Sequence, residues 1–135
     1  MITYAFQKII RNDTDRKMVI YYHDIPRIRV KTFRKQIEYL AKHFNIVKPS
    51  EILKAEPNGF GPTIAITVDD SFKNVYENAL PILKEYHVPA GVFVPVGNLG
   101  KKPEWEFREE CEDKHQEIMD LSQIIEMDLD GFEVN

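Results

Sequence analysis

Two adjacent aspartates directly follow a run of apolar and β-branched residues in the stretch TIAITVDDSFKN. Asp69 and Asp70 repel each other unless one takes up a proton or a cation lies between them. One carboxylate could ligate a divalent metal while its neighbour acts as a base toward water. Alternatively, Asp70 caps the following helix and Asp69 faces solvent. Position alone leaves both interpretations open.

The elements around the aspartates predict where they lie. Composition and periodicity predict strands at 17–25, 63–68, 88–97 and 132–135, a short strand from 45, and helices at 30–45, 74–87 and 115–131. The segment 63–68 does not alternate in hydropathy, so both of its faces should be buried. The β-α-β-α-β-α-β order predicts an α/β fold with parallel strands and right-handed crossovers.

The acidic C-terminal part is interpreted as a helix rather than a tail. Residues 104–135 carry 12 Asp and Glu but only 2 Lys and Arg. Apolar residues recur at helical spacing at 118, 121, 125 and 129, which predicts an amphipathic helix with a solvated acidic face. Pro81 is expected to start or kink the preceding helix.

Three candidate groups fall at strand ends, where parallel α/β architectures collect their functional residues. They are the His23–Asp24 pair, the Asp69–Asp70 pair and the turn at 95–98. His23 could be a pocket residue or a plain structural histidine. Trp105 lies in a charged, irregular segment and could stack on a sugar ring or anchor the segment to the core. We favour the anchor.

Composition limits the number of domains and the kinds of binding site the chain can have. The 135 residues are 43% hydrophobic, which is enough for one core. The single cysteine, Cys111, excludes an internal disulfide; with His115 it could bind zinc, but its charged surroundings favour a solvated surface. The basic residues are spread out, which argues against nucleic-acid binding.

Location stays open from the sequence. No stretch approaches the ~18 apolar residues of a membrane span, and residues 1–20 lack a signal-peptide core. As it stands, the chain looks cytoplasmic. It would belong to the cell envelope or the exterior if a leader has been removed.

Residues 17–135 resemble the polysaccharide deacetylases, carbohydrate esterase family 4, or NodB-homology domain. The stretch TIAITVDDSFKNVYENALPILKEYHVPAGVFV is similar to the family's T-F-D-D-G motif, its helix ending in L-K-K-Y, its V-P-A turn and its Phe-rich strand. VIYYHDI resembles the Y-H-x-I/V strand of the exopolysaccharide N-deacetylase branch. GFEVN resembles the segment ahead of the second motif, S-H-T/S-x-x-H. Ser71 stands where the family has glycine.

The resemblance implies a deformed seven-stranded (β/α) barrel, truncated here before it closes. This chain would be a single partial domain, with an N-terminal extension at 1–16, β/α units at 17–135 and a charged insertion at 97–116. The implied activity is metal-dependent removal of acetyl groups from an N-acetylhexosamine polysaccharide. That reaction hydrolyses a carbon–nitrogen bond other than a peptide bond.

Carried over, Asp69 would be the general base and Asp70 a ligand of a divalent metal, zinc foremost. His23 would lie at the rim of the pocket beside the acidic pair, and Asp24 and Trp105 are further candidates for the substrate pocket. The second-motif histidines would fall after Asn135, so we expect the chain alone to hold metal weakly or not at all and to be inactive. An incomplete barrel should also expose apolar faces and self-associate.

Two alternatives stay open at this point. The chain could be a non-catalytic, carbohydrate-associated or interaction domain that kept the fold and lost the site. It could instead be an unrelated α/β domain that uses the acidic pair and Mg²⁺ for phosphoryl transfer. That function would need a lysine and a further aspartate at other strand ends, and we find no convincing set.

Overall fold

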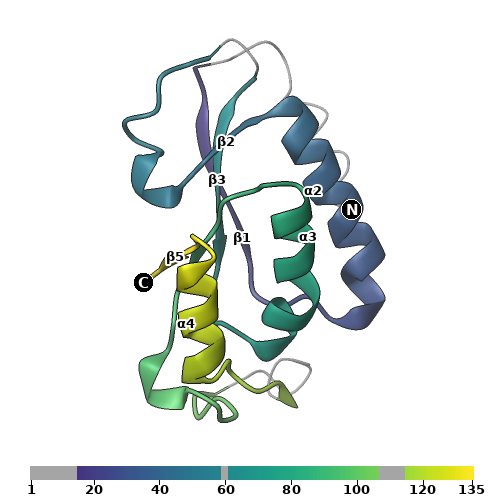
Figure 1. The fold of residues 1–135 in the computed structure, drawn as a ribbon, viewed down its shortest axis with the longest axis vertical. Coiled ribbons are helices and arrows are strands. Elements are labelled where there is room, and N and C mark those ends of the chain that lie inside the picture. The colour runs from purple at the N-terminus through teal and green to yellow at the C-terminus, as the bar shows by residue number, and fades with distance from the viewer. Residues whose placement is uncertain (1–14, 59–60, 107–114) are drawn as a thin grey trace.

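Five parallel strands form the sheet in the computed structural model, which describes residues 15–58, 61–106 and 115–135. The strands are β1 (Lys17–Tyr22), β2 (Asn45–Val47), β3 (Thr63–Val68), β4 (Gly91–Val92) and β5 (Glu133–Val134). Their order is β1-β3-β4-β5, and β2 pairs with the first half of β3. Because every pairing is parallel, the strands end toward the same edge of the sheet (Figure 1).

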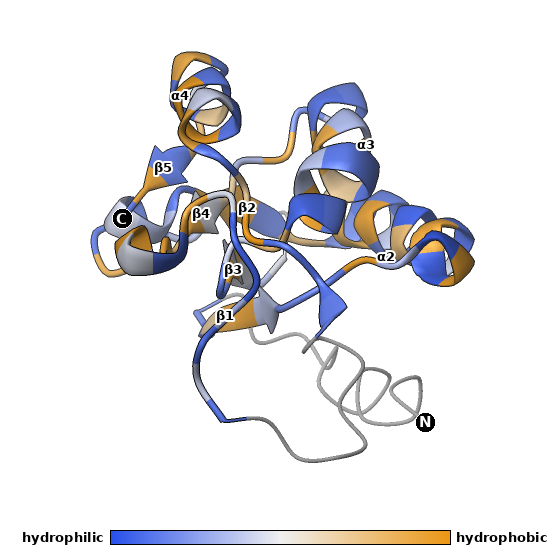
Figure 2. Cartoon of the chain, turned by 90° about the horizontal axis from the view of Figure 1, so that it is seen from below, coloured by the Kyte–Doolittle hydropathy of each residue, from blue (hydrophilic) through white to orange (hydrophobic). Residues whose placement is uncertain are grey.

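The helices lie on one side of this sheet. They are α2 (Val30–His43), α3 (Leu80–Glu85) and α4 (Leu121–Leu129). Figure 2 shows all three on the same side of the strands. A doubly wound sheet carries helices on both faces, whereas a (β/α) barrel carries them only outside. The open sheet is therefore consistent with a segment of a barrel, which confirms the predicted fold class.

The central strand β3 is buried along its whole length, as its lack of alternation predicted. Its residues Ile64, Ile66 and Val68 belong to the hydrophobic core. Helix α2 packs its predicted apolar face into the same core, through Phe33, Ile37 and Leu40. No helix in the described part of the chain is both long and apolar enough to cross a bilayer.

Several predicted elements differ in extent. The strand predicted at 17–25 ends at Tyr22, so His23 lies in the following loop. The strand predicted at 88–97 contracts to Gly91–Val92, because Pro89 and Pro95 cannot donate to a ladder. The short strand predicted from 45 is β2, and the described residues between it and β3 form only the 3-10 turn Pro49–Glu51. Most of the predicted extension at 1–16 and the middle of the insertion predicted at 97–116 lie outside the described residues.

The helix predicted at 74–87 is interrupted at its start. Residues Val75–Ala79 form a π-helical turn, and the regular helix α3 begins at Leu80. Pro81 has no N–H, so the α-helical bond to the carbonyl of Glu77 cannot form. The wider turn accommodates this loss, which confirms that Pro81 marks the start of the regular helix.

The turn after β3 has an unusual backbone. Asp70 and Ser71 both have positive φ, at 63° and 49°, in a region that L-residues other than glycine rarely adopt. The Ser71 side chain is fully buried, and its hydroxyl donates to the Phe93 carbonyl at 2.6 Å. The Ser71 carbonyl accepts from the Met119 N–H at 2.9 Å. The turn is thereby fixed to the end of β4 and to the segment before α4.

Helix α4 turns a different face to the core from the one predicted. It is shorter than the predicted helix at 115–131 and begins at a capping box between Asp120 and Gln123. Its buried residues are Ile124 and Met127. The residues at 121, 125 and 129 form an outward apolar stripe: Leu121, Ile125 and Leu129 are 59%, 50% and 81% exposed. The predicted apolar face is therefore exposed at 121, 125 and 129, whereas Ile118, which precedes the helix, is buried.

We expect this α4 stripe to drive self-association, because exposed apolar side chains at helical spacing form a contiguous patch. Ile125→Lys should lower the average mass measured by light scattering at equal protein concentration. Ile28→Lys is the matched control, since Ile28 is also an exposed isoleucine, at 89%, and lies outside α4. Equal masses for Ile125→Lys and the unmodified chain would show that the stripe does not mediate association.

Ser71 offers a matched pair of substitutions. Ser71→Ala loses the hydrogen bond to Phe93, worth about 1 kcal/mol, and keeps the backbone strain. Ser71→Gly loses the same bond but relieves the left-handed strain, worth on the order of 1–2 kcal/mol. In urea unfolding, Ser71→Gly should therefore be more stable than Ser71→Ala by roughly 1 kcal/mol or more. An alanine variant as stable as the glycine variant would contradict this account of the turn.

Candidate functional site

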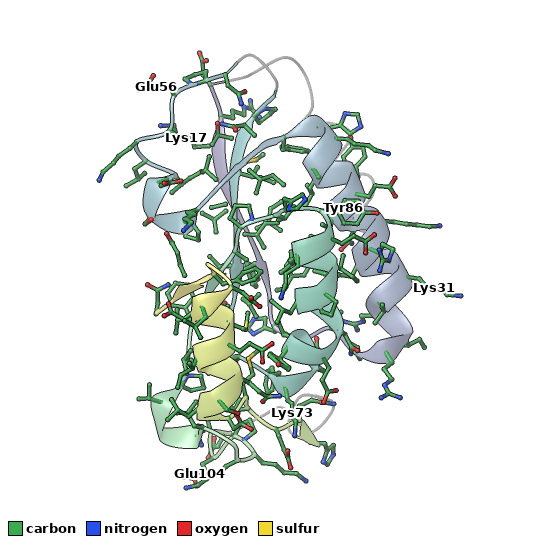
Figure 3. The ribbon with its side chains drawn as sticks, in the orientation of Figure 1. Lys17, Lys31, Glu56, Lys73, Tyr86 and Glu104 are labelled. Atoms are coloured by element: carbon green, nitrogen blue, oxygen red, sulfur yellow. The ribbon has the colours of Figure 1, made fainter. Side chains whose placement is uncertain are left out.

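A pocket of ≈ 430 Å³ opens at the edge where the strands end. Figure 3 places Lys17, at the start of β1, and Lys73, just after the acidic pair, at opposite ends of the molecule. The pocket lies at the Lys73 end, which is the carboxyl end of the strands. Its lining residues follow four different strands: His23, Asp69, Asp70, Phe93, Val94, Pro95 and Asn135.

Backbone hydrogen bonds fix the strand ends around the pocket. The N–H of Asp69 donates to the Tyr22 carbonyl at 2.8 Å, which continues the pairing of β1 and β3 by one residue. On the other side of β3, the N–H of Phe93 donates to the Val68 carbonyl at 2.8 Å. The half-buried Asp69 therefore follows β3 at a point where the ends of β1 and β4 are hydrogen-bonded on either side.

Asp70 and His23 contact each other at the pocket. His23 Nδ1 lies 3.2 Å from Asp70 Oδ2, and their side chains are 46% and 37% exposed. The π-helical turn that follows has no side-chain capping hydrogen bond at Asn74. The Asp70 carboxylate is thus turned toward His23, so these contacts favour a site residue over a helix cap.

Tyr22 precedes His23 in the chain, and its side chain has a structural role. Burial raises the pKa of Tyr22 to about 12, so the phenol stays protonated at neutral pH. Its hydroxyl lies 3.4 Å from Gln36 Oε1 on α2, and its ring packs edge-on against Phe33. Tyr22 therefore anchors the end of β1 to helix α2.

The structure does not bring all the predicted pocket residues together. Asp69, Asp70 and His23 meet, and Pro95 from the turn at 95–98 joins them. Asp24 does not line the pocket; its side chain is 15% exposed, and its carboxylate lies 3.8 Å from Arg29 Nη1. Trp105 is half-buried and is also absent from the pocket wall.

Sequence reasoning missed three lining residues, Phe93, Val94 and Asn135. Phe93 is 47% exposed and follows directly on the last residue of the short strand β4. Asn135 is held to β4 by two backbone bonds, from its N–H to the Val92 carbonyl and to its carbonyl from the Val94 N–H, both 2.9 Å. The prolines at 89 and 95 were the available signal that β4 is short and that the residues after it could turn toward a pocket.

The described residues do not by themselves complete a metal centre. Among residues 15–58, 61–106 and 115–135, no three His, Cys, Asp or Glu side chains come together in a group that could hold a metal ion. Asp70 and His23 supply two adjacent donors, and a tight protein site for zinc uses at least three. Cys111, the other half of the Cys111–His115 pair, lies outside the described residues.

Sequence comparison finds similar proteins over half of the chain. A poly-beta-1,6-N-acetyl-D-glucosamine N-deacetylase of Staphylococcus epidermidis is 34% identical over 71 residues, covering 50% of this chain and 25% of that protein. The protein of the same name from Staphylococcus aureus (strain MSSA476) is 36% identical over 73 residues, covering 52% and 25%.

Solved structures share the fold over most of the chain. The structure of IcaB from Ammonifex degensii superposes with a TM-score of 0.71 at 27% identity, covering 89% of this chain and 52% of that one. A de-N-acetylase from Aggregatibacter actinomycetemcomitans gives a TM-score of 0.63 at 21% identity, which shows the fold alone, and covers 90% and 53%.

The chain spans about half the length of these solved structures, and its match spans a quarter of the curated relatives. The family model described as polysaccharide deacetylase matches residues 57–134. That segment runs from the loop before β3 to the end of β5 and contains both aspartates of the pocket. It covers more than half of the sequence, so this chain belongs to the polysaccharide deacetylase family.

Proposed function

We propose that this chain carries the general base and one metal ligand of a deacetylase that acts on an N-acetylglucosamine polysaccharide. The observation that supports this most is the meeting of Asp69, Asp70 and His23 in one pocket at the carboxyl edge of the sheet. The relatives named poly-beta-1,6-N-acetyl-D-glucosamine N-deacetylase make that polymer the first substrate to test.

In this proposal Asp69 is the general base. It accepts a proton from the water molecule whose oxygen adds to the acetamide carbonyl. As the carbon–nitrogen bond breaks, the sugar nitrogen takes up the proton that the water lost, so that acetate is released and a free amine remains on the sugar. The half-buried position of Asp69, fixed by its backbone bond to Tyr22, suits a group that must approach a substrate from a defined direction.

Asp70 is proposed as a ligand of a divalent metal, with zinc foremost. The described residues do not complete such a site, so its other ligands must come from residues outside them. His23 is proposed as a pocket residue beside Asp70, on the strength of their 3.2 Å contact. We place Asp24 and Trp105 outside the pocket wall, since neither lines it.

The chain alone is proposed to be inactive, because a pocket with two adjacent donors lacks the ligands for a tight metal site. The same observation favours the second candidate, a non-catalytic domain that kept the fold. Membership of the family removes the third, an unrelated phosphoryl-transfer domain.

A chimera tests the catalytic proposal. This chain would replace the corresponding segment of the S. epidermidis enzyme, and acetate release from poly-β-1,6-N-acetylglucosamine would be measured. We expect activity in the chimera and a loss of roughly 10²–10⁴-fold in Asp69→Asn, because that variant cannot accept the proton. Asp130→Asn is the matched control, since Asp130 pairs with Lys84 away from the pocket.

Two results would count against the catalytic proposal. One is an active chimera in which Asp69→Asn retains full activity. The other is a chimera that folds, shown by a cooperative thermal transition, and yet releases no acetate. The second result would favour the non-catalytic candidate.

Zinc titration of the 135-residue chain tests the incomplete metal site. Calorimetry should detect no binding at micromolar affinity, because Asp70 and His23 alone make a poor ligand set. Asp70→Ala should give the same trace as the unmodified chain. Micromolar binding that disappears in Asp70→Ala would show that the described residues hold the metal after all.

A further inference from the structure

Two asparagines hold the loop that carries His23. The Asn74 Oδ1 accepts from the Ile25 N–H at 3.1 Å, and the Asn78 Nδ2 donates to the Ile25 carbonyl at 2.7 Å. The two asparagines lie one turn apart on the helical segment that follows the acidic pair. One residue of the loop is thus held through both of its backbone polar groups.

This asparagine clamp, Asn74 and Asn78 on Ile25, is one of two fixed points around His23. The other is the Tyr22 carbonyl, which accepts the Asp69 N–H at 2.8 Å. Only His23 and Asp24 lie between the two points. The backbone of His23 is therefore restrained from both sides by the segment that carries the aspartates.

The contact between His23 and Asp70 needs such support. Both side chains are more than a third exposed, and exposed ion pairs contribute little stability of their own. The pair cannot be expected to order the loop. The loop must instead present His23 to Asp70, and the clamp restrains the loop.

The chemistry of Asn74 also calls for an explanation. Its side chain is only 7% exposed, and its Nδ2 is buried without a hydrogen-bond partner among the described residues. A buried unsatisfied donor is destabilising, so stability alone does not explain an asparagine at this position. The hydrogen bond from the Ile25 N–H to Asn74 Oδ1 offsets part of that cost.

We infer that Asn74 and Asn78 are positioning residues that hold His23 against Asp70. The inference rests on the proposed function, because that function is what makes the contact important. The hydrogen bonds of the two asparagines do not depend on it. Among the described residues, the hydrogen bonds of the two asparagine side chains lead to Ile25 and not to the pocket aspartates. They act through the backbone of Ile25.

The tautomer of His23, observed by NMR on the labelled 135-residue chain, tests the inference. A carboxylate only accepts, so neutral His23 beside Asp70 should carry its proton on Nδ1. In Asn78→Ala the fraction of neutral His23 protonated on Nδ1 should fall to that of His87, an exposed histidine in the same spectrum. In Asn74→Ala the Ile25 amide should exchange at least roughly tenfold faster, because its acceptor is gone.

Asn45→Ala is the matched control. Asn45 Nδ2 donates to Thr63 Oγ1 at 3.2 Å at the opposite end of the sheet, so the variant also loses a half-buried asparagine bond. It should leave the His23 tautomer unchanged. A general loss of stability would affect all three variants alike, whereas loss of positioning would affect only the clamp variants.

A folded Asn78→Ala chain with an unchanged His23 tautomer would overturn the inference. Unfolding of Asn78→Ala would overturn it too, because Asn78 would then be needed for the fold itself. Should Asn74→Ala fail to fold, Asn78→Ala still decides, since Asn78 is half-exposed and alanine favours a helix. None of these readouts requires activity, so an inactive chimera would leave the result intact.

Discussion

The parallel pairing of β1 with β3 is the constraint on which the site depends. Six residues of each strand pair in register, from Lys17 with Thr63 to Tyr22 with Val68. Because β1 alternates between exposed and partly buried residues, a shift of one residue would turn its partly buried side chains to the exposed face. The register therefore brings His23 and Asp69 out at the same edge, although they are distant in the sequence.

The turn after β3 converts that register into a site. Two successive residues with positive φ redirect the chain, and the buried Ser71 hydroxyl ties the turn to the end of β4. Strain of this kind persists only where surrounding contacts determine the backbone. Here those contacts come from Phe93 and Met119. The Asp70 carboxylate consequently meets His23 rather than the helix that follows.

The sheet is open, and its helices leave apolar surface exposed. The helices cover one side of an open sheet, as in part of a barrel (Figure 2). Leu121, Ile125 and Leu129 remain exposed on α4. The two solved structures that share the fold are about twice as long as the part that this chain covers. The pocket also lies at the edge of the described sheet, where the described residues supply too few ligands for a metal.

The sequence by itself determined the α/β class, the extent of β3, the apolar face of α2 and the strand-end position of Asp69 and Asp70. These features follow from local composition and periodicity, which act over a few residues. Only the tertiary structure decided that Asp24 and Trp105 lie outside the pocket wall, that α4 buries Ile124 and Met127, and that Asn74 and Asn78 hold Ile25. Those outcomes depend on contacts between distant segments, and local patterns do not encode which face or loop a distant partner will meet.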